Sequence, residues 1–439
     1  MEEIKRDDYL NQLIRKKGNS LIKVITGLRR CGKSYLLFTI YYRYLISQGI
    51  REDHIIRFSF DVPEDIDKLD GYFPLESTYI KTEWGKPAKV NSKKFRAYIA
   101  DRVKEEGEYY LLLDEIQNLD NFVGTLNGFL RNERLDVYVT GSNSRFLSSD
   151  ILTEFRGRGD QIHIYPLSFR EFFDYRGISF KEAYEEYSYY GGMPLVQKFK
   201  DVNDKSSYLK NLYEETYLKD LIERNGISDG EALSKLIDIL ASAIGSYTNS
   251  AKLERQFKSE ANLTYSHQTI EKHIGFLVDS FLISKVTRYD IKGQNYLKAF
   301  YKYYFTDAGL RNAKLNFRQF EPTPIMENII FNELVSRGYS VDVGVVEVYE
   351  PNANKVTVKK QLEVDFVINA IDKRIYIQSA YSMPDLEKVA QEKKSLLRIG
   401  DSFEKIIIVN ENIRSFQCED GILILSLEDF LLKKGSCLI

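Results

Sequence analysis

Cysteine, tryptophan and long hydrophobic runs are all scarce in this sequence. Its 439 residues include one tryptophan and three cysteines, which are Cys31, Cys418 and Cys437. Cysteines so few and scattered exclude a disulfide scaffold and a cysteine zinc site, and they favour a reducing compartment. Apolar runs such as Leu111–Leu113 and Ile406–Val409 fall far short of the ~20 residues that a membrane helix needs. The first residues contain no apolar signal-peptide segment, so we expect a cytoplasmic protein without membrane contact.

An excess of charge of either sign is also lacking. The 62 lysine and arginine residues nearly balance 64 aspartate and glutamate residues, for a formal net charge of −2. This balance excludes a uniformly basic nucleic-acid coat and an acidic tail protein, although it allows local basic patches. A hydrophobic content of 43% excludes a mostly disordered chain. At roughly 150 residues per domain, we expect about three domains.

Five short apolar segments alternate with helical patterns in the first part of the chain. They are Leu21–Thr26, His54–Val62, Tyr109–Leu113, Leu135–Thr140 and Gln161–Tyr165. The third is uninterrupted by charge, as a strand buried on both faces should be. Strands separated by helices predict an α/β fold with a parallel sheet and right-handed crossovers.

The segment Gly27–Ser34 (GLRRCGKS) matches the pattern G-x-x-x-x-G-K-[ST]. Glycines let such a loop fold back, so that its backbone N–H groups and the following helix N-terminus bind phosphates. Lys33 would reach the β- and γ-phosphates, and Ser34 would place its hydroxyl on Mg²⁺. An ordinary turn with a surface lysine is the alternative, but the preceding strand and following helix favour a phosphate loop. The predicted nucleotide-binding residues are Gly27, Leu28, Arg29, Arg30, Cys31, Gly32, Lys33, Ser34 and Tyr35.

Two acidic residues, Asp114 and Glu115, end the apolar run YYLLL. A strand tip in an open parallel sheet faces the ligand crevice. Asp114 could hold the Mg²⁺ water shell, and Glu115 could orient or deprotonate the attacking water. An acidic helix cap after a strand is the alternative, and the upstream phosphate loop favours the catalytic interpretation.

Polar residues and arginines follow the next predicted strand. Thr140–Ser144 ends that strand, and a polar side chain there would lie near the γ-phosphate. Arginines follow at positions 145, 156 and 158, and an arginine can stabilise charge on the transferring phosphoryl group, from its own subunit or a neighbour. For any single arginine, a solvated surface role is the simpler alternative.

The second part of the chain has a different pattern. From residue 168 it is helical, and Leu263–Val286 has the pattern of a helix-turn-helix, in which Ser266 could cap the second helix. The alternating pattern of Tyr289–Phe305 then predicts two strands joined at Lys292-Gly293, which could form the wing of a winged helix. Beyond the prolines at 322 and 324, helices and strands predict a second α/β domain.

These features together resemble the AAA+-type ATPase family of bacteria and archaea with an AAA_14 core and a DUF4143 C-terminal region. The matching strings, in family order, are GLRRCGKS, LLLDEIQNL (111–119), VTGSNS (139–144), GRGDQIHIYPLSFREF (157–172) and YGGMP (190–194). The resemblance implies a P-loop ATPase core at 1–166, a helical lid at 167–228, a winged-helix domain at 229–320 and a nuclease-like α/β domain at 321–439.

The resemblance also implies functional roles and ligands. Asn143 or Ser142 would be sensor 1, and Arg158 the arginine finger. The cofactors would be ATP and Mg²⁺; ATP rests on the resemblance, since no guanine-specificity signature is present. We therefore expect an enzyme that hydrolyses ATP to ADP and phosphate.

One position departs from the nuclease pattern that the resemblance implies. Such nucleases use an upstream glutamate, an aspartate on one strand, and E-x-K on the next strand to hold Mg²⁺ and activate water. Glu327 and Asp365 fit the first two positions, but the third reads Gln378-Ser379-Ala380. The sequence therefore predicts an inactive nuclease-like domain.

The partner of the ATPase is left open by the sequence. The helix His267–Asp279 carries one basic residue, Lys272, whereas phosphate contacts dominate DNA affinity. Lys285, Arg288, Lys292 and Lys298 provide basic charge around the predicted wing. DNA binding through the winged helix and a protein-contacting role, including a homo-oligomer, remain alternatives. A motor or switch on nucleic acid, an ATP-gated protein-interaction switch with little turnover, and an ATP-regulated nuclease are the corresponding functions.

Overall fold

The computed structural model describes residues 3–81, 88–141, 155, 157–260, 265–351, 356–369 and 373–433. The chain divides into two compact units, the first spanning Glu3–Tyr165 and the second beginning at Pro166. Within the described ranges, no helix combines the length and the apolar character that a membrane crossing requires.

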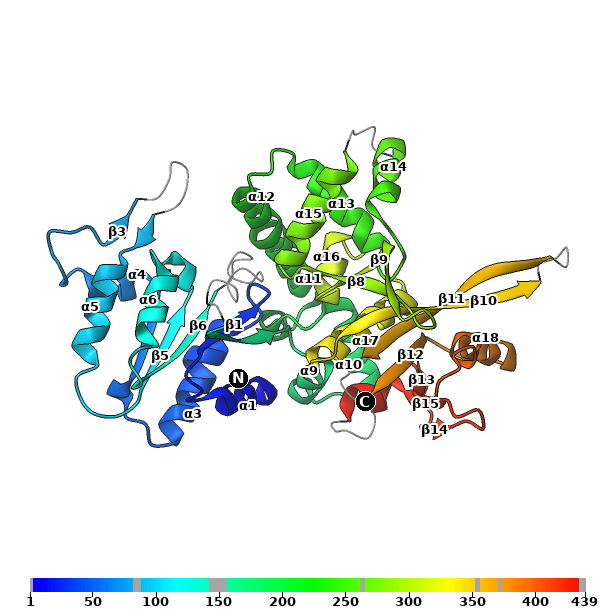
Figure 1. The fold of residues 1–439 in the computed structure, drawn as a ribbon, viewed down its shortest axis with the longest axis horizontal. Helices are drawn as coiled ribbons and strands as arrows, with labels where there is room; N and C mark the ends of the chain where they lie inside the picture. The colour runs from blue at the N-terminus through cyan, green and yellow to red at the C-terminus, as the bar shows by residue number, and fades with distance from the viewer. Residues whose placement is uncertain are drawn as a thin grey trace. The chain divides into compact units, whose positions relative to one another are not determined.

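The first unit alternates strands and helices (Figure 1). Its strands are β1 (Ile22–Gly27), β2 (Ile55–Ser59), β3 (Tyr79–Ile80), β4 (Lys89–Val90), β5 (Tyr109–Asp114), β6 (Leu135–Thr140) and β7 (Gly159–Ile164). Its helices are α1 (Asp7–Lys16), α2 (Lys33–Tyr35), which continues through a π-helical segment into α3 (Tyr42–Ser47), α4 (Pro63–Ile66), α5 (Ser92–Arg102) and α6 (Phe122–Phe129).

The central sheet of this unit has five strands in the order β2-β5-β6-β1-β7. Every neighbouring pair is parallel, which confirms the predicted α/β fold with a parallel sheet. In this order β6 lies between β1 and β5, so the carboxyl ends of these three strands are adjacent. Ligands of open parallel sheets bind at that edge.

Two strands of this sheet, β1 and β5, are covered on both of their faces. All six residues of β1 and all six of β5 are buried. Burial on both faces explains why the sequence shows continuous hydrophobic runs here instead of alternation. Side chains such as Val24, Phe58, Leu111 and Val139 form one continuous core with α5 and α6.

The second unit begins with helices and ends with a mixed sheet. Its helices are α9 (Phe169–Arg176), α10 (Phe180–Tyr190), α11 (Val202–Asn211), α12 (Lys219–Asn225), α13 (Gly230–Ser242), α14 (Ser250–Glu260), α15 (His267–Asp279), α16 (Ala308–Lys314), α17 (Pro322–Ser336), α18 (Leu386–Leu397) and α19 (Leu427–Leu432). Its strands are β8 (Ile283–Asp290), β9 (Asn295–Phe305), β10 (Val341–Pro351), β11 (Thr357–Asn369), β12 (Arg374–Ala380), β13 (Glu404–Val409), β14 (Phe416–Gln417) and β15 (Leu423–Ser426).

The predicted helix and hairpin in the middle of the chain are present. Ser266 caps α15 by accepting a hydrogen bond from the Thr269 backbone N–H, and Ile270, Ile274 and Leu277 are buried on one face of that helix. Strands β8 and β9 then form an antiparallel hairpin whose turn contains Lys292-Gly293. The helix cap and the hairpin are therefore confirmed.

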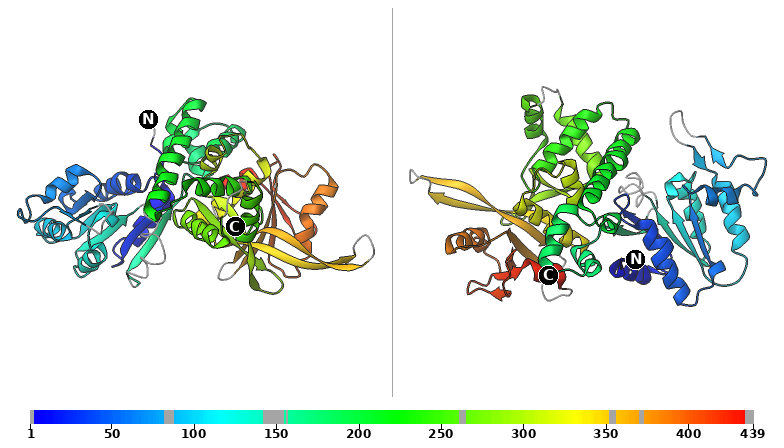
Figure 2. Two further views of the ribbon diagram at one scale, coloured as in Figure 1. Left: turned by 90° about the horizontal axis from the view of Figure 1, so that it is seen from above. Right: turned by 180° about the vertical axis from the view of Figure 1, so that it is seen from behind.

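That hairpin is part of a larger sheet. The eight strands have the order β14-β15-β13-β12-β11-β10-β8-β9, and β8 pairs in parallel with β10. The hairpin thus extends the sheet of the C-terminal α/β region instead of standing apart from it. Strands β10 and β11 project beyond the rest of this sheet as a long two-stranded arm (Figure 2).

Candidate active site

The segment that follows β1 folds as a tight loop around two glycines. Gly27 has φ 142°, and a Cβ at this position would lie 2.1 Å from the Ile164 carbonyl oxygen, so only glycine fits. Gly32 has φ 102° and directly precedes the helix that begins at Lys33. The glycine positions of the motif are therefore required by the backbone itself.

Lys33 turns back over this loop. Its Nζ donates hydrogen bonds to the carbonyl oxygens of Gly27 (2.9 Å) and Leu28 (3.0 Å), and the residue is buried. The ammonium group is thus held inside the curve of the loop. An anion bound by the loop would meet a positive charge there.

The other residues of the loop divide between the core and the surface. Leu28 and Cys31 are buried, and the Cys31 thiol donates to the Ile164 carbonyl oxygen at 3.4 Å. Arg29, Arg30 and Ser34 are exposed. The buried pair anchors the loop to the sheet, while the exposed side chains remain accessible to a ligand.

Ser34 and Asp114 lie 80 positions apart in the sequence and meet in the structure. The Ser34 side chain lies near enough to the Asp114 carboxylate to lower its pKa, and Thr140 Oγ1 donates a hydrogen bond to the same carboxylate. These three residues come from the start of the helix after β1, the end of β5 and the end of β6. The sheet order brings them together because β6 lies between β1 and β5.

The carboxylates at this edge repel one another. Burial raises the pKa of Asp114, the charges of Glu115 and Asp61 raise it further, and the neighbouring hydroxyls of Thr140 and Ser34 lower it. Three acidic groups therefore lie close together beside a hydroxyl. Oxygen donors of this kind are the ligands that Mg²⁺ prefers, and a cation would relieve the repulsion between them.

Glu115 has an unusual backbone conformation. Its φ of 51° is in the left-handed region, and its N–H donates to Thr140 Oγ1 at 3.3 Å. Its carboxylate accepts a hydrogen bond from the Gln117 side chain. Non-glycine residues with this conformation cluster at functional sites, because the surrounding structure must hold them there.

Thr140 is a site residue whose role was not apparent from the sequence. It is fully buried, donates to Asp114 at the end of β5 and accepts from the N–H of Glu115, which follows β5. Ser142 and Asn143, the predicted sensor residues, lie outside the described residues, as do the arginines at 145 and 156. The signal that could have found Thr140 is its place as the last residue of a buried strand.

Arg158 does not belong to the same cluster of residues. It is exposed, its side chain donates to Asn127 Oδ1 at 3.3 Å, and its carbonyl oxygen accepts from the Ile22 N–H at the start of β1. The phosphate loop follows the other end of β1. At about 3.3 Å per residue, the length of β1 separates Arg158 from the loop by about 16 Å. Arg158 therefore lies at the opposite end of β1 from the phosphate loop.

His163 is a further ionisable group near the loop. Its Nδ1 lies 3.0 Å from Thr26 Oγ1, within hydrogen-bond distance. Burial, reinforced by the positive charge of Lys33, lowers the pKa of His163 to about 4. The imidazole is therefore neutral near pH 7.

The positions that a nuclease would use have other partners. Lys302, from β9, donates to the carboxylates of Glu327 (2.8 Å) and Glu363. Burial opposes the charge of Lys302, but Glu327 and neighbouring acids hold its pKa well above the usual value. Asp365 accepts a hydrogen bond from the Ser379 N–H at 2.7 Å. Strand β12 has no lysine at the position of the E-x-K pattern. A lysine from another strand, Lys302 of β9, instead forms ion pairs in this cluster.

Three basic residues of the hairpin also contact their own chain. Lys285 Nζ lies 3.8 Å from the centre of the Tyr301 ring. Arg288 is buried and donates to Gln361 at 2.7 Å, and Lys292 donates to the Glu347 carbonyl oxygen at 3.1 Å. These neutral partners hold the three side chains against their own chain while leaving their charges in place.

Comparison with known families assigns the first unit to a class. Residues 19–173 match the family described as AAA domain (AAA_14), so the chain contains an AAA-type P-loop domain. Residues 181–321 match a domain of unknown function, DUF8612. These two matches do not show the predicted relation to DUF4143.

Full-length relatives define the family of the whole chain. An uncharacterized protein of Haemophilus influenzae is 33% identical over 436 residues, covering 98% of this chain and 99% of the relative. The chain belongs to the same family as that protein. An uncharacterized protein of Methanocaldococcus jannaschii is 28% identical and covers 89% of this chain and 82% of its own length.

Solved structures share only part of the architecture. The ORC2 protein of Aeropyrum pernix aligns with 75% of this chain and 93% of its own, at 15% identity and a TM-score of 0.36. The Cdc6p protein of Pyrobaculum aerophilum aligns with 75% of this chain and 95% of its own, at 14% identity and a TM-score of 0.28. Similarity at this level does not extend to function.

Proposed function

We propose that this protein is a Mg²⁺-dependent ATPase that hydrolyses ATP to ADP and phosphate. The observation that carries the proposal is that Ser34, at the start of the phosphate-loop helix, lies near enough to the Asp114 carboxylate to lower its pKa. A hydroxyl at the start of a phosphate-loop helix and an acid at a neighbouring strand tip are the two protein ligands that such a Mg²⁺ uses. When bound, the metal would neutralise charge on the β- and γ-phosphates.

The chain's own residues would bind and orient the substrate. The loop N–H groups and Lys33 would hold the phosphates, with the Lys33 ammonium leaving the carbonyl oxygens of Gly27 and Leu28. Glu115 would orient or deprotonate the attacking water, with its backbone fixed by Thr140. Water would then bond to the γ-phosphorus as the bond to the bridging oxygen breaks.

Residues from outside this cluster would complete the site. We assign the sensor role to Asn143 or Ser142. Arg158 would act as an arginine finger on the nucleotide of a neighbouring copy, since it lies far from its own phosphate loop. This assignment requires a homo-oligomer during turnover.

The use of the ATP energy is a separate question. We infer coupling to the region proposed as a lid (167–228), a winged helix (229–320) and an inactive nuclease-like domain (321–439). A protein partner is favoured over DNA, because Lys285, Arg288 and Lys292 are engaged within the chain. An ATP-gated protein-interaction switch is therefore the second candidate function.

Phosphate release by the purified full-length chain, with and without single- or double-stranded DNA, tests these alternatives. We expect Mg²⁺-dependent release that the Glu115→Gln variant loses while still binding ATP. DNA-stimulated release would favour a nucleic-acid motor over the protein switch. Release that is unchanged in Glu115→Gln would remove this residue from the mechanism.

A further inference from the structure

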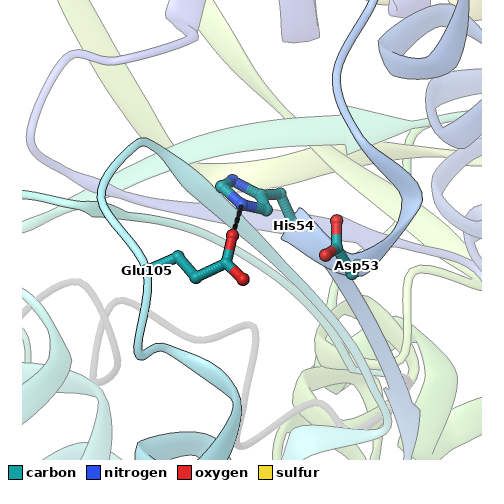
Figure 3. A group of neighbouring side chains, drawn as sticks. All are labelled: Asp53, His54 and Glu105. Atoms are coloured by element: carbon teal, nitrogen blue, oxygen red, sulfur yellow. Dashed lines mark ion pairs between the residues drawn. The ribbon is translucent and has the colours of Figure 1, made fainter.

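Asp53, His54 and Glu105 lie close together in the first unit (Figure 3). His54 directly precedes β2, and Glu105 lies in the loop before β5. Since β1, β2 and β5 run in the same direction, this cluster is at the amino ends of the strands, whereas the phosphate loop follows the carboxyl end of β1. The cluster is therefore separate from the proposed nucleotide site.

The His54 ring is fixed by its surroundings. It stacks on Tyr109 with ring centres 4.1 Å apart and an angle of 8° between the planes. On the backbone of Gly107, which has φ 119°, a Cβ would lie 3.1 Å from His54 Cε1. Its Nδ1 lies 3.0 Å from the Glu108 carbonyl oxygen. Because a carbonyl can only accept, Nδ1 carries a proton, and in the neutral ring Nε2 carries a lone pair.

This lone pair faces a carboxylate. His54 is 8% exposed, and its Nε2 has no hydrogen-bond partner among the described residues. The Glu105 Oε2 atom lies 4.0 Å away, beyond hydrogen-bond distance (Figure 3). With Asp53, three ligand atoms lie within 4.8 Å of one another. Two electron-rich atoms held in this way leave a place for a cation between them.

We propose that Asp53, His54 and Glu105 bind a divalent transition-metal ion of the zinc class. A histidine whose Nδ1–H is bonded to a backbone carbonyl is oriented as metal-ligating histidines usually are. Zn–N and Zn–O bonds of about 2.1 Å place two tetrahedral ligands about 3.4 Å apart, so only a small movement is needed. The Asp53 and Glu105 side chains are 59% and 60% exposed and can make it. Harder ions such as Mg²⁺ favour sites with oxygen ligands only.

Arg51 would compete with a metal ion for the carboxylates of Asp53 and Glu105. Its Nη1 donates to Glu105 Oε2 at 2.7 Å, and its Nε donates to Asp53 Oδ1 at 3.0 Å. Its side chain is 58% exposed, so the guanidinium can move into solvent when an ion enters. Removing Arg51 should therefore strengthen metal binding. If the cluster were only a structural ion pair, removing Arg51 would instead leave Asp53 and Glu105 less ordered.

Calorimetric titration of the full-length chain with zinc chloride tests the proposal. We expect one binding event that Glu105→Gln and Asp53→Asn each weaken at least roughly tenfold. Arg51→Ala should bind zinc more tightly than the wild type. Asp101→Asn is the matched control, since Asp101 lines the same surface hollow without belonging to the three ligands, and its affinity should equal the wild-type value.

Two results would overturn the zinc site. One is zinc binding that all these substitutions leave unchanged, which would locate the ion elsewhere; the other is no saturable heat up to about 1 mM zinc. The Lys33→Ala variant separates this site from the proposed ATPase. It should bind zinc like the wild type even if nucleotide binding is lost, and failure of either proposal leaves the other intact.

Discussion

Replacing Thr140 with valine should destabilise the first unit and its acidic cluster together. The hydroxyl is fully buried, donates to Asp114 and accepts from the Glu115 N–H. Valine has nearly the same shape but can do neither. Losing a buried hydrogen bond to an acidic group, and leaving an N–H without its partner, costs about 2 kcal/mol. For a unit of this size, that corresponds to a fall in melting temperature of about 4–8 °C.

The assay is thermal unfolding of the full-length chain followed by circular dichroism, with phosphate release measured on the same variants. Thr140→Ser keeps the hydroxyl and is the matched control. Phosphate release should fall in the valine variant and be largely retained in the serine variant. Equal stability and turnover in the two variants would refute the role given to Thr140.

Three further substitutions test the loop, its helix and its histidine. Gly27→Ala should cost about 3 kcal/mol or prevent folding, because its Cβ would meet the Ile164 carbonyl oxygen, whereas Gly128→Ala, with open space in helix α6, should cost nothing in a denaturant titration. Ser34→Ala should weaken ATP binding in Mg²⁺ but not in EDTA, measured by equilibrium titration, and equal weakening in both would argue against a metal ligand. The pKa of His163 is lowered to about 4 in the folded unit, so unfolding should become easier as pH falls from 6.5 to 4, by up to about 3 kcal/mol. Below pH 6.5 the unfolded chain takes up the proton first, and the His163→Asn variant should lack this part of the pH dependence.

Local patterns were sufficient to predict the strands and the phosphate loop. The five predicted strands are present as β1, β2, β5, β6 and β7. The clearest local signal is the apolar run of β5, whose six residues are all buried. Glycine positions and the lysine-serine pair also follow from local chemistry. The same holds for the Ser266 helix cap and the hairpin after it.

Contacts between distant segments could not be predicted in the same way. Nothing near Thr140 in the sequence reveals that β6 lies beside β5, so its bonds to Asp114 and Glu115 required the sheet order. The pairing of β8 with β10 and the ion pair between Lys302 and Glu327 depend likewise on register between distant strands. Local propensity carries no information about such pairings.

The charge distribution of the second unit bears on what the ATPase would act upon. The Lys302 ammonium group pairs with Glu327, one of the carboxylates that a nuclease would need for Mg²⁺, and with Glu363. Three basic side chains of the hairpin, Lys285, Arg288 and Lys292, likewise contact their own chain, and the side chain of Lys298 lies outside the described part. Both observations agree with a role for this unit in protein contacts, which the phosphate-release experiment with DNA examines.

The most direct test of the central claim is the affinity for ATP in the presence of Mg²⁺, compared between the wild type and Lys33→Ala. Lys33 is the one ammonium group inside the curve of the described phosphate loop, so its loss should weaken binding by roughly 100-fold or more, about 2.7 kcal/mol. Equal affinity in the two proteins, or no ATP binding by the wild type, would contradict the account.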